Sequence, residues 1–159
     1  MNRTTPPADI WRPDVTVACV VPQQGKFLLV EENVRGELVL NQPAGHLEPD
    51  ESLLQAAVRE ALEETGWSVE LTQLVGIYQW ANDAGHFLRF TFAALALSHD
   101  PARELDAGIV RALWLSRDEI AAAQARLRSP MVLRGVDDFL AGKRLPLDAL
   151  HCLFNKALP

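Results

Sequence analysis

One short segment of the chain places glycine, arginine and glutamate residues at fixed intervals. It runs from Gly45 to Trp67 and reads GHLEPDESLLQAAVREALEETGW. Its fixed positions, written G-x5-E-x7-R-E-x-x-E-E-x-G, are Gly45, Glu51, Arg59, Glu60, Glu63, Glu64 and Gly66. At ordinary residue frequencies, seven such matches arise by chance in about one chain in a million. We therefore look for the chemistry of this protein in this segment.

The glutamates of this segment predict a divalent metal site. On a helix, Glu60 and Glu64 share one face and Glu63 lies beside them, and each pair of like charges destabilises an isolated helix by about 0.2–0.5 kcal/mol. A hard cation such as Mg²⁺ offsets this repulsion, prefers oxygen ligands and takes its remaining ligands from water and substrate phosphates. The segment therefore indicates a metal-assisted reaction on a phosphate ester or anhydride, with Mg²⁺ as the expected ion and Mn²⁺ as the alternative.

Arg59 and Gly45 have supporting roles in this interpretation. Arg59 is adjacent to Glu60 in sequence, so the two are not expected to face each other on the helix. Arg59 is expected to reach Glu63 or Glu51 and to fix the orientation of a carboxylate; the alternative is a surface salt bridge of little energy. Gly45 permits a backbone conformation in which its carbonyl points at a metal, although a simple turn glycine remains compatible with the pattern.

Strands and helices in irregular order are expected to position these residues. The central helix is predicted over 52–65, opened by a capping box of Ser52 and Gln55 and ended by Gly66. Strands are predicted over 15–21, 26–31, 37–41, 74–80, 86–97 and 110–115, with further helices over 117–126 and 131–141. This order favours an α/β (α+β) fold, an α/β/α sandwich with a mixed β-sheet, in one domain over 1–159 with a loose arm over 1–12.

The composition of the chain indicates which binding partners and which cellular location to expect. The chain has 159 residues and a net charge of −6, so a nucleic acid polymer or an anionic membrane is a poor partner. No run approaches the roughly 20 apolar residues that span a membrane, and the first residues, MNRTTPPADI, lack a hydrophobic signal region. Two isolated cysteines, Cys19 and Cys152, form no disulfide framework. We expect a cytoplasmic protein that is a monomer or a small homo-oligomer.

At these residues the chain resembles the Nudix hydrolases. The segment matches their signature at every charged and glycine position, whereas Ala61 and Trp67 stand where the family prefers an aliphatic residue. Short sequence segments that flank the signature resemble one branch of this family, the bacterial phosphatases of pyrophosphorylated small molecules. These flanking pieces are VTVACVV, NQPAGHLE, Gln79-Trp80, FLRF over 87–90 and RSP over 128–130.

The resemblance implies a Nudix-type sandwich and a metal-dependent hydrolase of phosphoanhydrides. Its substrates would be nucleoside di- and triphosphates and the pyrophosphates of thiamine and hydroxymethylpyrimidine, with release of inorganic phosphate. The implied metal ligands are the Gly45 carbonyl, Glu60, Glu64 and Glu63, and the implied catalytic residues are Glu60, Glu63, Glu64, Arg59 and Glu51. The base is left open between a helix glutamate and a loop residue, Glu104 or Asp106.

Three residues outside the signature are candidate substrate contacts. Arg89 either clamps phosphate or points outward from its strand, Trp80 either stacks on a planar ring or packs in the core, and Gln42 is close enough to the metal loop to read polar ring atoms. Two other functions stay open: a Nudix pyrophosphohydrolase for another nucleotide, such as an oxidised nucleotide, a dinucleoside polyphosphate or a nucleotide sugar, and a non-catalytic ligand-sensing module of the same fold.

Overall fold

The computed structural model describes residues 10–154, so the expected N-terminal arm over 1–12 lies largely outside the described residues. Eight strands and three α-helices follow one another in mixed order, with two short 3₁₀ turns, η1 (Gln124–Arg126) and η2 (Leu147–Ala149). The strands are β1 (Asp14–Val20), β2 (Pro22–Gln23), β3 (Lys26–Val34), β4 (Glu37–Asn41), β5 (Ala44–His46), β6 (Trp67–Asn82), β7 (Gly85–His99) and β8 (Ile109–Ser116). The helices are α1 (Leu53–Thr65), α2 (Arg117–Ala122) and α3 (Met131–Leu140).

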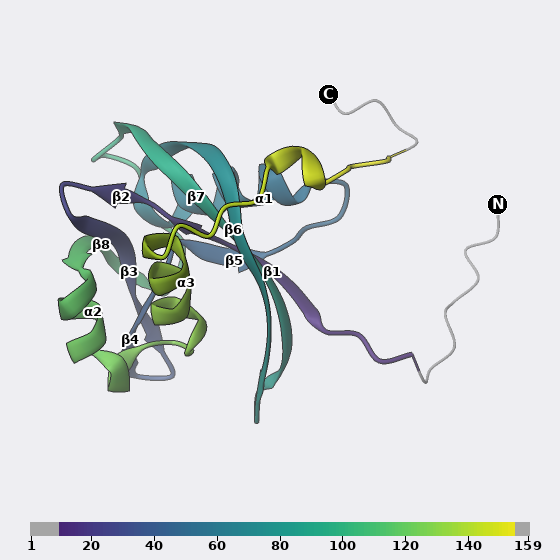
Figure 1. Cartoon of the computed structure of the whole chain (residues 1–159). Helices are drawn as coiled ribbons and strands as arrows, with labels where there is room; N and C mark the ends of the chain where they lie inside the picture. The colour runs from purple at the N-terminus through teal and green to yellow at the C-terminus, as the bar shows by residue number, and fades with distance from the viewer. Residues whose placement is uncertain (1–9, 155–159) are drawn as a thin grey trace.

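The strands form two sheets (Figure 1). The first is mixed, in the order β5-β1-β7-β6, with β1 parallel to β7 and the other pairs antiparallel. The second is antiparallel: β3 pairs with β2, β4 and β8. The mixed sheet expected from the sequence is therefore confirmed, and a second sheet accompanies it. Strand periodicity does not reveal which strands pair, because pairing depends on contacts between distant segments.

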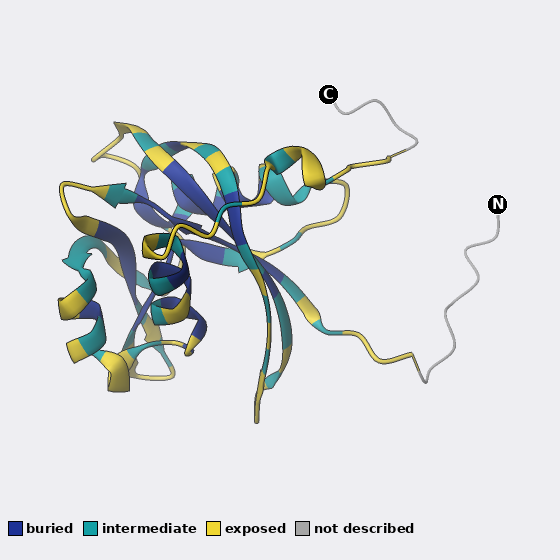
Figure 2. Ribbon diagram, in the orientation of Figure 1, coloured by how far each residue is buried: buried dark blue, intermediate teal, exposed yellow. Residues whose placement is uncertain are grey.

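Helices cover both faces of the mixed sheet, as expected for an α/β/α sandwich. α1 packs against β1, β5 and β6 on one side, while α3 contacts β6 and β1. Along β1 the side chains alternate between two apolar cores: Val17 and Cys19 belong to the core under α1, and Val20 belongs to the core under α2 and α3. Figure 2 shows the buried residues running through the middle of the molecule between the helices.

α1 begins and ends as its local sequence predicts. The Ser52 hydroxyl accepts a hydrogen bond from the Gln55 backbone N–H at 3.1 Å, and the Gln55 side chain accepts from the Ser52 N–H at 2.8 Å. Gly66 adopts φ 72° and donates its N–H to the Leu62 carbonyl. An added Cβ at Gly66 would lie 2.7 Å from the Asp100 carbonyl oxygen, so both the conformation and the packing require glycine here.

Several boundaries differ from the sequence expectation. β6 begins at Trp67 instead of residue 74, because register shifts interrupt the alternation that marks a strand. α2 ends at Ala122, and η1 replaces its expected continuation to residue 126. The segment before α3 is strand-like: Leu127 pairs with Leu40 of β4, and the Arg128 N–H donates to the Leu40 carbonyl at 2.8 Å.

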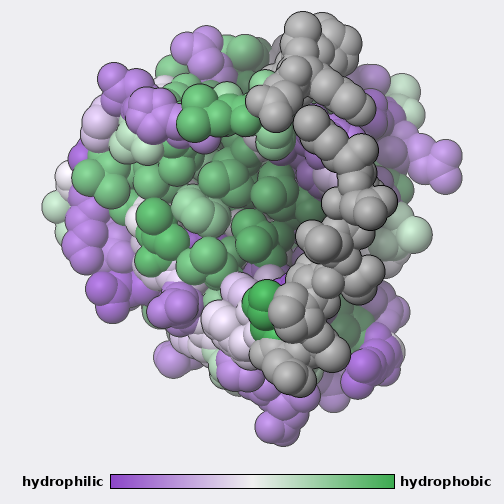
Figure 3. Space-filling model, turned by 90° about the vertical axis from the view of Figure 1, so that its right-hand side faces the viewer, coloured by the Kyte–Doolittle hydropathy of each residue, from purple (hydrophilic) through white to green (hydrophobic). Residues whose placement is uncertain are grey.

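Within residues 10–154, no helix is long and apolar enough to cross a membrane. Apolar side chains do reach the surface, and Figure 3 shows a broad apolar area on one face of the molecule.

Candidate active site

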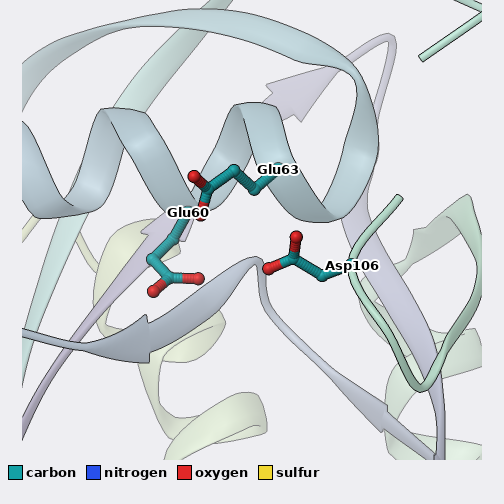
Figure 4. Close-up of side chains that lie close together, drawn as sticks. All are labelled: Glu60, Glu63 and Asp106. Carbon is teal, nitrogen blue, oxygen red and sulfur yellow. The ribbon is translucent and has the colours of Figure 1, made fainter. Parts of the chain in front are cut away.

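Three carboxylates lie close together beside the C-terminal half of α1. Glu60 and Glu63 project from the helix and Asp106 from the loop between β7 and β8 (Figure 4). One carboxylate oxygen of each lies within 4.8 Å of the others. Glu60 is buried, Glu63 is half-buried and Asp106 is exposed, so the cluster lies at the boundary between core and solvent. We call Glu60, Glu63 and Asp106 the acidic cluster.

Backbone hydrogen bonds fix the loop that carries Asp106. The Asp106 N–H donates to the Glu63 carbonyl at 3.1 Å, the Asp100 N–H donates to the Gly66 carbonyl at 2.9 Å, and the Gly108 carbonyl accepts from the Asn33 N–H at 2.8 Å. Of the two loop acids left open by the sequence, the structure brings Asp106 to the cluster. Glu104 is exposed and is not a member of the cluster.

Gly45 lies directly against Glu60. A Cβ on Gly45 would overlap the Glu60 carboxylate, so only a glycine leaves room for this carboxylate in its place. Gly45 belongs to β5, which pairs with β1 at Val17. The structure therefore brings the signature glycine and a signature glutamate together, as a shared metal site requires.

Arg59 binds three glutamates at once. Its Nε and Nη2 donate to the two oxygens of Glu51 at 2.9 and 2.7 Å, and its Nη1 donates to Glu60 at 2.8 Å and to Glu63 at 3.0 Å. The expectation that Arg59 and Glu60 do not meet was wrong, because the long arginine side chain folds across the helix surface to reach its neighbour. Glu51 also accepts from the Glu48 N–H, so it anchors Arg59 outside the acidic cluster.

Burial changes the proton affinity of the two inner glutamates. Burial raises the pKa of Glu64 to about 8, against the opposing effect of the hydrogen bond from the Ala44 N–H at 2.9 Å. Burial likewise raises the pKa of Glu60, although Arg59 pulls it down. Several oxygen donors held together with an unfavourable charge are what a hard divalent cation stabilises. Glu60, Glu63 and Asp106 therefore fit a Mg²⁺-type ion. The predicted ligand Glu64 is not a member of the acidic cluster, but it lines the cavity together with Glu60.

A cavity of about 720 Å³ opens beside this cluster. The cavity is lined by three signature residues, Gly45, Glu60 and Glu64. Arg89 and Trp80 line it as well. Arg89 is only 6% exposed, and burial lowers its pKa to about 10. Of the two alternatives for Arg89, the outward-pointing one is therefore wrong, and its guanidinium faces the cavity.

Trp80 and Gln42 lie in different surroundings. Trp80 is half-buried, lines the cavity and stacks on Phe87, with ring centroids 5.5 Å apart and planes at 26°. Gln42 is 1% exposed and donates its Nε2 to the Val132 carbonyl at 2.7 Å, so it supports the start of α3. Trp80 therefore lines the cavity, whereas Gln42 is buried and does not line it.

Among the polar residues of the cavity that the sequence did not single out are Glu32 and Asn41. Both line it, and the Asn41 Nδ2 donates to a Glu32 oxygen at 3.1 Å. Glu32 lies at the end of β3 among alternating residues, where a charged side chain ordinarily faces solvent. In the structure Glu32 lies on the cavity wall, hydrogen-bonded to Asn41 of β4, at a register irregularity between β3 and β8.

Comparisons with known proteins agree with this geometry. A family model described as the NUDIX domain matches residues 11–134. The chain is 44% identical over 142 residues to the phosphatase NudJ of Escherichia coli strain K12, which covers 89% of this chain and 92% of that protein. A Nudix hydrolase from Nitrosomonas europaea superposes with a TM-score of 0.87 at 54% identity, over 89% of this chain and 98% of that one.

A more distant likeness concerns the fold alone. An ADP-ribose pyrophosphatase from Streptococcus suis has a TM-score of 0.63 at 19% identity, over 83% of this chain and 93% of that one. With the signature glutamates Glu60 and Glu64 at the cavity and the family model covering most of the sequence, the chain belongs to the Nudix family and is a phosphohydrolase of acid anhydrides.

Proposed function

We propose that this enzyme is a Mg²⁺-dependent phosphatase of pyrophosphorylated small molecules. Its substrates are nucleoside di- and triphosphates and the pyrophosphates of thiamine and hydroxymethylpyrimidine, and its product is inorganic phosphate. The observation that carries this proposal is the position of Glu60, which belongs both to the acidic cluster and to the cavity wall. A small molecule in the cavity therefore has its phosphates next to the carboxylates.

The residues of the chain divide the work of the reaction. Glu60, Glu63 and Glu64, with the Gly45 carbonyl, would hold the metal, which would supply charge neutralisation at the phosphoryl oxygens and a lowered pKa of water. Arg59 keeps Glu60 and Glu63 in place through hydrogen bonds of 2.8 and 3.0 Å, and Glu51 in turn holds Arg59. A carboxylate of the acidic cluster, Asp106 or a helix glutamate, accepts the proton of the attacking water.

The remaining cavity residues bind the organic part of the substrate. Trp80 offers an aromatic face to a planar ring, and Arg89 supplies a buried cation. Gln42 contributes indirectly, because it holds the start of α3 and thereby the wall of the cavity.

A substrate panel with product analysis tests this function. The purified enzyme with Mg²⁺ is given nucleoside diphosphates, nucleoside triphosphates and thiamine pyrophosphate, and phosphate and pyrophosphate are measured separately. We expect inorganic phosphate from each, complete loss of turnover with a chelator and recovery with added Mg²⁺. Pyrophosphate as the product, or turnover confined to an oxidised nucleotide, a dinucleoside polyphosphate or a nucleotide sugar, would favour the alternative Nudix pyrophosphohydrolase.

We also propose a cytoplasmic location. Cys19 and Cys152 are both free thiols, which suits a reducing compartment. Fractionation of cells that produce the protein tests this, and recovery outside the cytoplasm would contradict it.

A further inference from the structure

A second set of polar side chains lines the same cavity. Glu32 comes from β3, Asn41 from β4 and Arg89 from β7, so three strands of two sheets supply them. The Asn41 amide joins the other two: its Nδ2 donates to Glu32 at 3.1 Å, and its Oδ1 accepts from Arg89 Nη1 at 3.4 Å. Asn41 therefore holds an acceptor and a donor side by side.

Both charged groups keep unused hydrogen-bonding capacity. A carboxylate accepts about four hydrogen bonds and a guanidinium donates five. Glu32, whose side chain is 16% exposed, accepts one from Asn41 and has a long ion pair of 3.7 Å with Arg128. Within residues 10–154, Arg89 has only the 3.4 Å contact, and its buried Nε–H has no partner. Because a buried unpaired polar group is unfavourable by about 1–3 kcal/mol, this pair suits a polar ligand.

The Asn41 amide shows which chemical pattern this pair accepts. An amide places an acceptor oxygen beside an N–H donor, and Arg89 and Glu32 bind those two groups respectively. A ring nitrogen beside an exocyclic amine has the same order of acceptor and donor. We propose that Glu32 and Arg89 recognise the aminopyrimidine edge of the substrate, with the exocyclic amine donating to Glu32 and the ring nitrogen accepting from Arg89.

This assignment rests on the proposed function and specifies its substrate class. An oxo group in place of the amine would set a second acceptor against the Glu32 carboxylate, and a site built to accept an N–H discriminates strongly against an analogue that lacks it. Trp80 and Phe87, stacked together on the cavity wall, offer a face for the same ring. A cytosine or thiamine-type ring is therefore favoured over uracil.

Kinetics with three diphosphates test the inference: cytidine diphosphate, uridine diphosphate and a ring-free alkyl diphosphate. We expect kcat/KM of the wild-type enzyme to be about tenfold or more higher for cytidine than for uridine diphosphate, the effect of one hydrogen bond to a charged group. Glu32→Gln should bring this ratio close to one, and the alkyl diphosphate reports any separate effect of this change at the phosphate end. Glu70→Gln is the matched control, because Glu70 is an exposed strand glutamate that does not line the cavity.

Each contrary result has a distinct meaning. Equal wild-type rates for the two nucleotides, or a Glu32→Gln variant that keeps the wild-type ratio, would overturn the inference and leave the proposed function standing. An equal loss on all three substrates would place Glu32 at the phosphate end and overturn it as well. If the wild type hydrolysed no diphosphate, the proposed function would fail, and calorimetric titration with CMP and UMP would decide the inference: equal affinities would overturn it.

Discussion

Glu64 carries a carboxyl group that is held away from solvent, with one oxygen 2.9 Å from the Ala44 N–H and a pKa raised to about 8. Near neutral pH a substantial fraction of this group is protonated when no metal is bound. A metal ligand must be ionised, so the same burial that disfavours its charge prepares Glu64 to exchange a proton for a cation. Two predictions follow from this residue.

Glu64→Gln should lower turnover by about 100-fold or more, because the amide removes the charge that faces the metal and keeps the shape of the side chain. The fold should persist, since a neutral amide avoids the burial penalty of the carboxylate. Steady-state kinetics and a thermal melt measure the two effects. Turnover within threefold of the wild type would contradict the assignment of Glu64, and Glu70→Gln on the exposed part of β6 serves as the control.

The binding of Mg²⁺ at pH 7 should release protons. Because the pKa of Glu64 in the folded protein lies above its ordinary value of 4.5, the folded state holds the proton more tightly than the unfolded chain. The stability that this group contributes is present below about pH 4.5 and is lost as the pH rises towards 8, and Mg²⁺ affinity should rise over the same window. Calorimetry in two buffers of different ionisation enthalpy measures the number of protons released. Glu64→Gln should abolish the part of this release that comes from Glu64.

At the scale of elements, the site depends on how α1, β5 and the loop after β7 meet. The signature read from the sequence located α1 and its caps correctly, because the signals of a helix end are local: Ser52 and Gln55 at one end and Gly66 at the other. The position of Asp106 was not predictable, since it follows from hydrogen bonds of a distant loop to Glu63 and Gly66. Glu32 was missed because a charged residue near the end of a strand ordinarily faces solvent.

Gly45→Ala should reduce turnover by about 100-fold, because the new methyl group overlaps the Glu60 carboxylate and small displacements of a reacting group have effects of this size. The backbone of Gly45 does not have positive φ, so alanine leaves the strand itself unstrained. Kinetics of Gly45→Ala, Glu60→Gln and the double variant measure the coupling. Fully additive losses would show that Gly45 does not act through Glu60.

At the scale of the whole molecule, a bound cation should stabilise the fold. A ligand at 100 times its dissociation constant adds about 2.7 kcal/mol to the free energy of unfolding. For a chain of 159 residues this corresponds to a rise in Tm of about 5–10 °C. Thermal melts with and without MgCl₂ measure it, with NaCl of equal ionic strength as the control. An unchanged Tm at saturating Mg²⁺, in a protein that still hydrolyses diphosphates, would place the metal on the substrate alone.

The mixed sheet was predictable from the irregular order of strands and helices, whereas the second sheet and the cavity that it helps to enclose were not. Glu32 of β3 and Asn41 of β4, both in the second sheet, line this cavity together with Arg89 of β7 in the first sheet. The single domain over 1–159 and the oligomeric state stay predictions. Analytical ultracentrifugation measures the oligomeric state.

The hydrogen bond between the Asp106 N–H and the Glu63 carbonyl also has a consequence for refolding. Helical turns form from local signals within microseconds, whereas contacts between distant segments form more slowly, so we expect the loop to dock after α1 has formed. Recovered enzymatic activity after dilution from urea should therefore lag behind the recovered helical circular dichroism signal. Enzymatic activity would then report the last stage of folding, in which the active site is completed.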